Sequence, residues 1–169
     1  MIHRSILLAS SRMLISGWLA ASVCLSLPAQ AAGGPLPSTF GSTVGSALLC
    51  KDHIDPYYFW NYLNQFAGPP YKTEGGAYWF KVQGSLWGGE ITDVLVSDGK
   101  GEQIFLAAHF KGTPAKLADA IAATAGIRYV QEGATPDAPL ISSLGGKIVF
   151  AGSNANIYCK QYNLDYSRR

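Results

Sequence analysis

The sequence predicts a single α+β domain with an antiparallel sheet, and three observations support this fold class. Residues 77–110 read as three strands joined by two turns, and two other segments have the apolar spacing of helices. In addition, the strands are grouped in hairpins instead of alternating with helices, which is typical of α+β proteins. The predicted order is α-β-β-β-α-β-β-β, with two helices packed on a central three-strand meander and a C-terminal hairpin.

The N-terminal segment has the features of a cleavable export signal. Arg4 and Arg12 precede an apolar run that is too short to span a bilayer, and an Ala-x-Ala cleavage site ends at Ala31. We therefore predict that residues 1–31 are a signal peptide, which includes Cys24. The mature chain is expected in the periplasm or outside the cell, with no stable membrane insertion after cleavage.

Charge composition excludes one class of partner. The predicted signal peptide carries two of the thirteen basic residues and none of the eleven acidic ones, so the mature chain has eleven of each and is neutral. No basic stripe remains to follow a phosphate backbone, and we expect no nucleic-acid partner. The remaining length suits one domain with one core.

Two cysteines remain in the mature chain, Cys50 and Cys159. An even pair of cysteines in an exported domain indicates a disulfide bond. The loop that it closes is long, and the chain-entropy model gives a stabilisation of about 4 to 5 kcal/mol for such a loop. This bond would tie the first helical region to the last strand.

The first helix is predicted after a leader. Residues 32–45 are rich in Gly, Pro, Ser and Thr, and we expect a flexible leader there, followed by the folded domain at 46–165. Asp55 followed by Pro56 is a helix start, and the helix should cover 56–67. Its apolar stripe consists of Phe59, Tyr62, Leu63 and Phe66.

The central meander is predicted from alternation and turn chemistry. Its first strand places Tyr78, Phe80 and Val82 on one face, and a glycine-rich connection at 84–89 leads to the second strand. The second turn, at 97–101, contains Asp-Gly, which supplies the positive φ that tight hairpins require. The apolar face of the third strand consists of Ile104, Leu106, Ala108 and Phe110.

A second helix and a final hairpin complete the predicted domain. Thr113 and Pro114 repeat the capping pattern, and the helix should end at Gly126. The remaining elements are expected as follows: a short strand at 127–130, a surface loop at 131–146, hairpin strands at 147–151 and 156–161, and a tail at 166–169.

Catalytic and metal-binding patterns are weak. One hypothesis takes Cys50 as a nucleophile and His109 as its base, a layout similar to that of papain-like and cell-wall cysteine peptidases, although the local motif around the cysteine is absent. Asp52, His53 and Asp55 lack a second ligand group at metal-binding spacing, so no metal or other cofactor is predicted. Asp55 is expected to cap the first helix.

Alternation places His109 on the strand face opposite Phe110, together with Phe105 and Ala107. It also places Asp93 on one face with Ile91 and Leu95. Both polar residues would then lie among apolar neighbours on a sheet, where a hydrogen-bonded structural role and a functional role are alternatives.

Aromatic density is the remaining functional signal. Eleven of the twenty aromatic residues lie between Tyr57 and Trp87. Tyr57, Trp60, Trp79 and Trp87 fall outside the predicted core faces, and large aromatic side chains at the surface are typical anchors for protein partners or sugar rings. Trp87, set among glycines, is the strongest single candidate for a binding residue, and packing at the edge of the core is its alternative role.

These observations favour a small exported binding protein that recognises another protein, in its most concrete form an inhibitor or an immunity-type protein. One alternative is a cell-wall-directed cysteine hydrolase that uses Cys50 and His109. The other is a carrier for a small ligand or a cell-wall glycan in the concave face of the sheet.

Overall fold

A computed structural model describes residues 35–166 of the chain. The predicted signal peptide and the last three residues of the predicted tail lie outside this range. Within it, the helices are α1 (Ser46–Leu48), preceded by a π-helical turn η1 (Gly41–Gly45), α2 (Pro56–Ala67) and α3 (Pro114–Ala125). The strands are β1 (Lys72–Glu74), β2 (Ala77–Leu86), β3 (Gly89–Ser97), β4 (Gln103–Phe110), β5 (Tyr129–Gln131), β6 (Leu140–Ser142), β7 (Lys147–Ala151) and β8 (Asn154–Tyr162).

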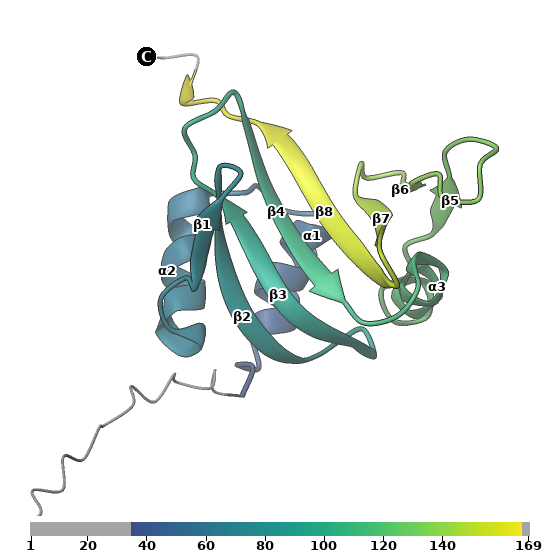
Figure 1. Ribbon diagram of the computed structural model, residues 1–169, viewed down its shortest axis with the longest axis horizontal. Coiled ribbons are helices and arrows are strands. Elements are labelled where there is room, and N and C mark those ends of the chain that lie inside the picture. The colour runs from purple at the N-terminus through teal and green to yellow at the C-terminus, as the bar shows by residue number, and fades with distance from the viewer. Residues whose placement is uncertain (1–34, 167–169) are drawn as a thin grey trace, which may run out of the picture. The chain divides into compact units, whose positions relative to one another are not determined.

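All eight strands belong to one antiparallel sheet with the order β1-β2-β3-β4-β8-β7-β6-β5 (Figure 1). The α+β class, the central meander and the C-terminal hairpin are therefore confirmed. The last strand, β8, pairs with β4 along its length, so the C-terminal strand lies in the middle of the sheet. None of the helices in the described part of the chain is long and apolar enough to cross a membrane.

The structure also contains strands that the sequence did not predict. β1 and β6 are three residues long, and β6 lies inside the segment 131–146 that was expected to be a loop. Segments this short contain too few residues to show an alternation pattern, and they form strands because β2 and β7 offer them hydrogen-bonding partners. The two short strands β1 and β5 are the edges of the sheet.

The two predicted helices have the expected bounds and caps. Asp55 Oδ1 accepts hydrogen bonds from the backbone N–H groups of Tyr57 and Tyr58, at 2.9 and 3.1 Å. Thr113 caps α3, and Gly126 follows it with φ 70°, a left-handed conformation that suits glycine. The capping signals in the sequence therefore located both helices correctly.

The prediction of a flexible leader at 32–45 is wrong for residues 35–45, the part of it that the structure describes. Phe40 and Val44 are buried in the core, and η1 and α1 form a continuous helical segment that packs on the sheet. The reason is that two large apolar side chains gain burial against the sheet, which outweighs the weak helix propensity of a Gly- and Ser-rich segment. The ordered domain thus begins before Ser46.

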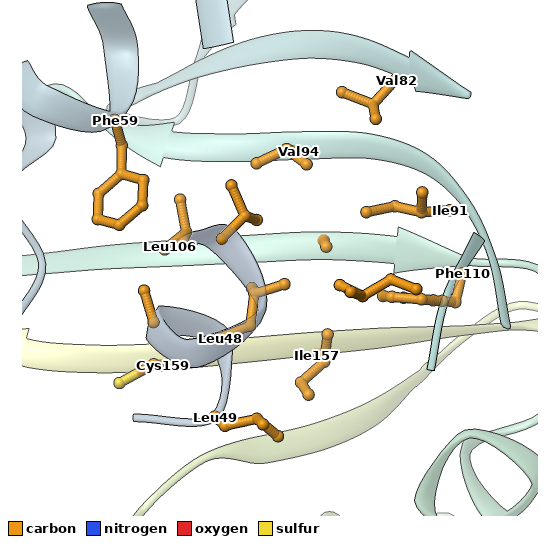
Figure 2. Close-up of a cluster of buried hydrophobic side chains, with 14 of the residues drawn as sticks. Leu48, Leu49, Phe59, Val82, Ile91, Val94, Leu106, Phe110, Ile157 and Cys159 are labelled. Atoms are coloured by element: carbon orange, nitrogen blue, oxygen red, sulfur yellow. The ribbon is translucent and has the colours of Figure 1, made fainter. Parts of the chain in front are cut away.

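The main core lies on one face of the sheet, and all described helices contribute to it. Leu48 from α1 and Phe59 from α2 pack against Leu106 and Ile157 from the central strands (Figure 2). Cys159 of β8 is buried in the same core and forms a disulfide bond with Cys50, just after α1. The predicted disulfide is therefore confirmed, and it ties the N-terminal helical segment to the central strand.

The β2–β3 connection is shorter than the expected 84–89. The two strands continue to Leu86 and from Gly89, leaving Trp87 and Gly88 as a two-residue turn with φ values of 55° and 82°. Two successive positive φ angles are the signature of a type I′ hairpin turn. Trp87 is thus a non-glycine residue held in the left-handed region.

Candidate functional site: the open face of the sheet

The second face of the sheet differs from the first because no described helix contributes to its packing. Its apolar centre consists only of sheet residues, namely Ala77, Leu95 and Ala107, flanked by Trp79, Phe105 and Tyr158. In Figure 1, α1 and α2 lie behind the sheet, on the side of the main core. We call the opposite side, within residues 35–166, the open face.

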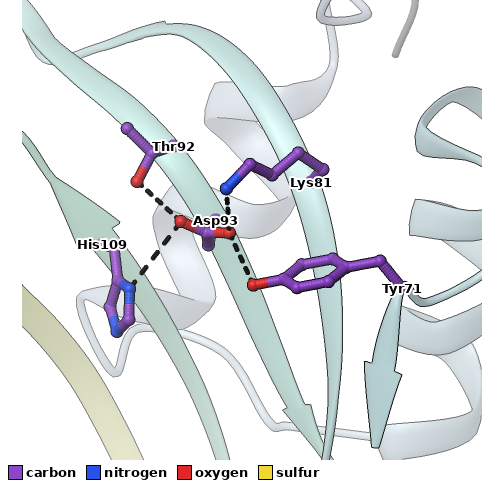
Figure 3. Close-up of polar contacts among 5 residues, drawn as sticks. All are labelled: Tyr71, Lys81, Thr92, Asp93 and His109. Carbon is purple, nitrogen blue, oxygen red and sulfur yellow. Dashed lines mark hydrogen bonds and ion pairs between the residues drawn. The ribbon is translucent and has the colours of Figure 1, made fainter. Parts of the chain in front are cut away.

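A buried carboxylate lies beside this apolar cluster on the open face. Asp93 of β3 is 6% exposed, and both of its oxygens are engaged (Figure 3). Tyr71 Oη and Lys81 Nζ donate to Asp93 Oδ1, at 2.9 and 3.0 Å. Thr92 Oγ1 donates to Oδ2 at 2.8 Å, and His109 Nδ1 lies 3.8 Å from the same oxygen.

A β-bulge brings these side chains together. Ile91 of β3 pairs with Phe110 of β4, and Asp93 pairs with His109. The two pairs are two residues apart on β3 but only one residue apart on β4, so Thr92 is the extra residue of β3. A second register shift, between Lys81 and Gly84 of β2, lies at the same level of the sheet. Bulges bend a sheet and re-aim side chains, which explains why the hydroxyl of Thr92 reaches its neighbour Asp93.

The bulge also corrects the sequence-based assignment of faces on β3. Strict alternation placed Ile91, Asp93 and Leu95 together, but Ile91 is fully buried in the main core on the other side. Asp93 and Leu95 do lie on the open face. An extra residue reverses the alternation pattern on one side of a bulge, and its position leaves no signal in the apolar spacing.

The environment of Asp93 keeps its carboxylate ionised. Burial by itself raises the pKa of Asp93, but hydrogen bonds from Thr92, Lys81 and Tyr71, together with the charge of Lys81, outweigh burial and lower this pKa below its ordinary value of 3.8. Burial, and then the hydrogen bond to Asp93 and its negative charge, raise the pKa of Tyr71 to about 12. The tyrosine therefore remains a hydrogen-bond donor.

His109 lies beside this cluster as a neutral side chain. It is half-buried on β4, and its ring forms a T-shaped pair with that of Trp79, with centroids 5.4 Å apart. Burial lowers the pKa of His109, and this effect outweighs the opposing charge of Asp93. The prediction that His109 shares a face with Phe105 and Ala107 is confirmed by the pairing of β4 with β8 and by the composition of the two cores.

The Cys50/His109 hydrolase hypothesis is contradicted. The sulfur of Cys50 is bonded to Cys159, and an oxidised sulfur cannot act as a nucleophile. The two candidates also lie on different sides of the sheet, because Cys159 faces the main core and His109 the open face. In the cluster around Asp93, Thr92 Oγ1 donates a hydrogen bond to a carboxylate that Tyr71 and Lys81 also hold, which suits structural support of this carboxylate.

Cations and aromatic rings lie next to each other on the open face. Lys72 Nζ is 4.7 Å from the centroid of the Trp79 ring, and Lys81 Nζ is 5.3 Å from that of Tyr71. Trp79 Nε1 donates to the carbonyl oxygen of Glu74, at 3.3 Å. Lys72 therefore covers one face of the Trp79 ring.

The four aromatic candidates from the sequence do not form one site. Trp79 lies on the open face, whereas Trp60 and Tyr57 line a separate pocket of about 460 Å³ at the N-terminal end of α2. Trp87 is on the side of the main core, where its ring stacks on Phe110 at 5.9 Å and packs against Gly45. Its contacts are those of a residue at the edge of the core.

Sequence reasoning missed Tyr71, Lys81 and Thr92 as partners of Asp93. Lys81 alternates with Trp79 on β2, which is a weak hint that both lie on one face. Neither the bulge nor the pairing of β1 with β2, which positions Tyr71, leaves a recognisable pattern in the sequence. Within residues 35–166 there is no group of three or more metal-ligating side chains.

Comparison with known proteins found no match to this chain among family models, curated protein sequences or solved structures.

Proposed function

We propose that this chain is a small exported binding protein, stapled by its disulfide, that recognises another protein through the open face. In its most concrete form it is an inhibitor or an immunity-type protein of the periplasm. The observation that carries the proposal is the asymmetry of the sheet: all described helices pack on one face, while the other combines aromatic side chains with a fully engaged buried charge.

The size of the open face suits a protein partner. From β1 to β7 in the sheet order there are five strand intervals of about 4.8 Å, and the longer strands extend for roughly 26 Å. The flat area is therefore roughly 600 Å², before the relief of the side chains is included. This approaches the ~800 Å² that each partner contributes to a standard protein interface.

The rigidity of this face also supports recognition of a protein. The side chains of Tyr71 and Lys81 are held by Asp93, and the ring of Trp79 is held by Glu74 and Lys72. Binding costs less conformational entropy when contact residues are ordered beforehand. Aromatic side chains surrounded by polar groups are also the typical anchors of protein interfaces.

Covalent chemistry supports the proposed compartment. A disulfide across a long loop is stable in an oxidising environment, and the predicted signal peptide would deliver the chain to one. An intact mass of the natively purified protein, without reductant, tests this part of the proposal. A chain that starts at Ala32 and takes up no alkylating reagent is expected; a retained N-terminal segment would contradict export by cleavage.

Partner capture tests the recognition face. The folded protein, immobilised through its C-terminus, should retain a partner from the periplasmic fraction, and the affinity should be measured again with that partner purified. A Phe105→Ala/Tyr158→Ala variant should weaken binding at least about tenfold, because two aromatic anchors of the face are lost.

The matched control is Tyr58→Ala, which removes a half-exposed aromatic residue from α2 on the other side of the sheet. It should bind as the unmodified protein does. Equal losses in the two variants, or retained binding in the open-face variant with an unchanged fold, would exclude the open face as the recognition surface.

A further inference from the structure

A pocket of about 460 Å³ lies outside the open face, at the end of the sheet where β3 turns into β4. Its walls come from the first turns of α2, the β3–β4 turn and the segment after β8. The lining includes three aromatic residues, Tyr57, Trp60 and Tyr78, and three carboxylates, Asp55, Asp98 and Asp165. Its volume falls within the range of pockets that bind small molecules, about 300 to 1,000 Å³.

The aromatic walls offer ring surfaces to a ligand. Tyr57 is 77% exposed, so its ring is not needed for the core. Trp60 is half-buried and meets Tyr78 edge-on, with centroids 6.4 Å apart and ring planes at 74°. The faces of Trp and Tyr rings carry negative partial charge and attract cations within about 6 Å.

The walls are held in place by the fold. Asn163 Nδ2 donates to the carbonyl oxygens of Gly99 and Gly101, both at 2.9 Å, which fixes the segment after β8 to the β3–β4 turn. Gly99 has φ 70° and lies against Pro56, the first residue of α2. The three wall segments are therefore assembled before any ligand arrives.

The carboxylates have few positive partners. Within residues 35–166 the three form one ion pair, between Asp98 Oδ2 and Lys100 Nζ, at 3.8 Å and with Lys100 78% exposed. Asp55 uses Oδ1 to cap α2, and Asp165 is exposed at the pocket rim. The N-terminus of α2 contributes about half a positive charge. Three negative charges against Lys100 and this half-charge leave the pocket negative by roughly 1.5 charges.

We propose that this pocket binds an organic cation, an alkylammonium or guanidinium group, between the rings of Tyr57 and Trp60 and the carboxylates of Asp98 and Asp165. Aromatic faces and carboxylates are complementary to a cation that is also partly apolar, and the negative potential repels anions. The cation comes either from a free small amine or from a Lys or Arg side chain of a protein. This inference is independent of the open face, because none of the pocket residues belongs to the cluster around Asp93.

The test is a titration of the folded, disulfide-bonded protein followed by the indole N–H resonance of Trp60, at low ionic strength because salt screens such sites. The probes are tetramethylammonium and methylguanidinium, with tert-butanol as a neutral molecule of similar shape. The two cations should give saturable shifts of this resonance, and tert-butanol should give none. A peptide Gly-Lys-Gly with blocked ends, compared with methylammonium, distinguishes the two sources of the cation by their relative affinities.

A pair of matched variants tests the role of charge. Asp98→Asn/Asp165→Asn removes two negative charges, and the asparagine oxygen at position 98 can still accept the hydrogen bond from Lys100 N. This variant should weaken cation binding about tenfold with an unchanged melting temperature. The control Asp119→Asn/Asp137→Asn removes two exposed carboxylates elsewhere and should bind normally.

Three results would overturn the proposal: no shift of the Trp60 resonance with either cation, an equal shift with tert-butanol, or equal affinities of the two double variants. Tyr57→Ala adds a test of the aromatic wall without disturbing the core, since the side chain is exposed. It should weaken tetramethylammonium binding several-fold, and unchanged binding would exclude the aromatic wall from the site.

Discussion

The two faces of the sheet use the same strands in opposite ways. On β4, Leu106 and Phe110 point into a core sealed by helices, while Ala107 and His109 point to a face whose apolar centre consists of sheet residues alone. The first face buries almost only apolar side chains, and the second holds an ionised carboxylate with four polar neighbours. One face of this sheet therefore carries most of the apolar core, while the other keeps aromatic and polar side chains that no described helix covers.

The largest effect should come from the disulfide, which belongs to the covered face. A Cys50→Ala/Cys159→Ala variant loses a cross-link between residues separated by 109 positions. The chain-entropy model assigns about 4 to 5 kcal/mol of the free energy of unfolding to such a link. Urea unfolding of both proteins measures the difference. A loss below about 1 kcal/mol would mean that the unfolded chain is already compact around this link.

Truncation on β4 compares the two faces directly. Leu106→Ala creates a cavity in the main core and should lower the free energy of unfolding by about 3 kcal/mol. Phe105→Ala removes a larger side chain from the neighbouring position, but this side chain is half-buried on the open face, so the expected loss is about 1 kcal/mol. Urea unfolding measures both losses. If the two variants lose similar free energies of unfolding, the open face must be covered in solution.

Removal of the buried carboxylate tests what holds the open face together. Asp93→Ala leaves Tyr71, Lys81 and Thr92 without their common acceptor and should lower the free energy of unfolding by about 2 kcal/mol. Asp93→Asn keeps an acceptor oxygen, so its free energy of unfolding should decrease by less. If the two variants unfold at the same urea concentration, the hydrogen bonds of the cluster contribute little to the stability of the fold.

Trp87 offers a smaller test on the covered face. Trp87→Ala should lower the free energy of unfolding by about 2 kcal/mol, because stacking on Phe110 and packing against Gly45 are lost. Trp87→Gly should be more stable than the alanine variant by about 1 kcal/mol, since glycine adopts φ 55° without strain. Partner binding should be unchanged in both variants if they fold. A selective loss of binding would instead restore Trp87 as a recognition residue.

The smallest expected effect is the pH dependence of the open face. His109 has a lowered pKa in the folded protein, so the unfolded chain takes up a proton first as the pH falls below about 6.5. Stability should therefore decrease in this range. Asp93, with its pKa lowered from 3.8, adds a second loss only at more acidic pH.

His109→Gln is the control for the first of these ranges, because glutamine does not titrate. Chemical unfolding at several pH values between 7 and 5 should show a weaker pH dependence in this variant. An identical dependence in both proteins would assign the effect to other groups.

The local part of the fold could be predicted because its signals act over a few residues. Asp55 and Thr113 satisfy the first N–H groups of their helices, and Gly126 adopts a conformation that other residues avoid. Alternation in β2 and β4 reflects the geometry of a single strand, whatever its partner. The pairing of Cys50 with Cys159 could be predicted because only these two cysteines follow the predicted signal peptide.

Tertiary structure alone decided the site. The register of β3 against its two neighbours creates the bulge that moves Ile91 to the core and brings Thr92 next to Asp93. Tyr71 reaches the same carboxylate from outside the meander, because β1 pairs with β2. Helix starts, turns and alternation are set by the conformations open to a few neighbouring residues. Strand register and the covering of one face depend instead on the packing of segments that are distant in the chain, which no local pattern encodes.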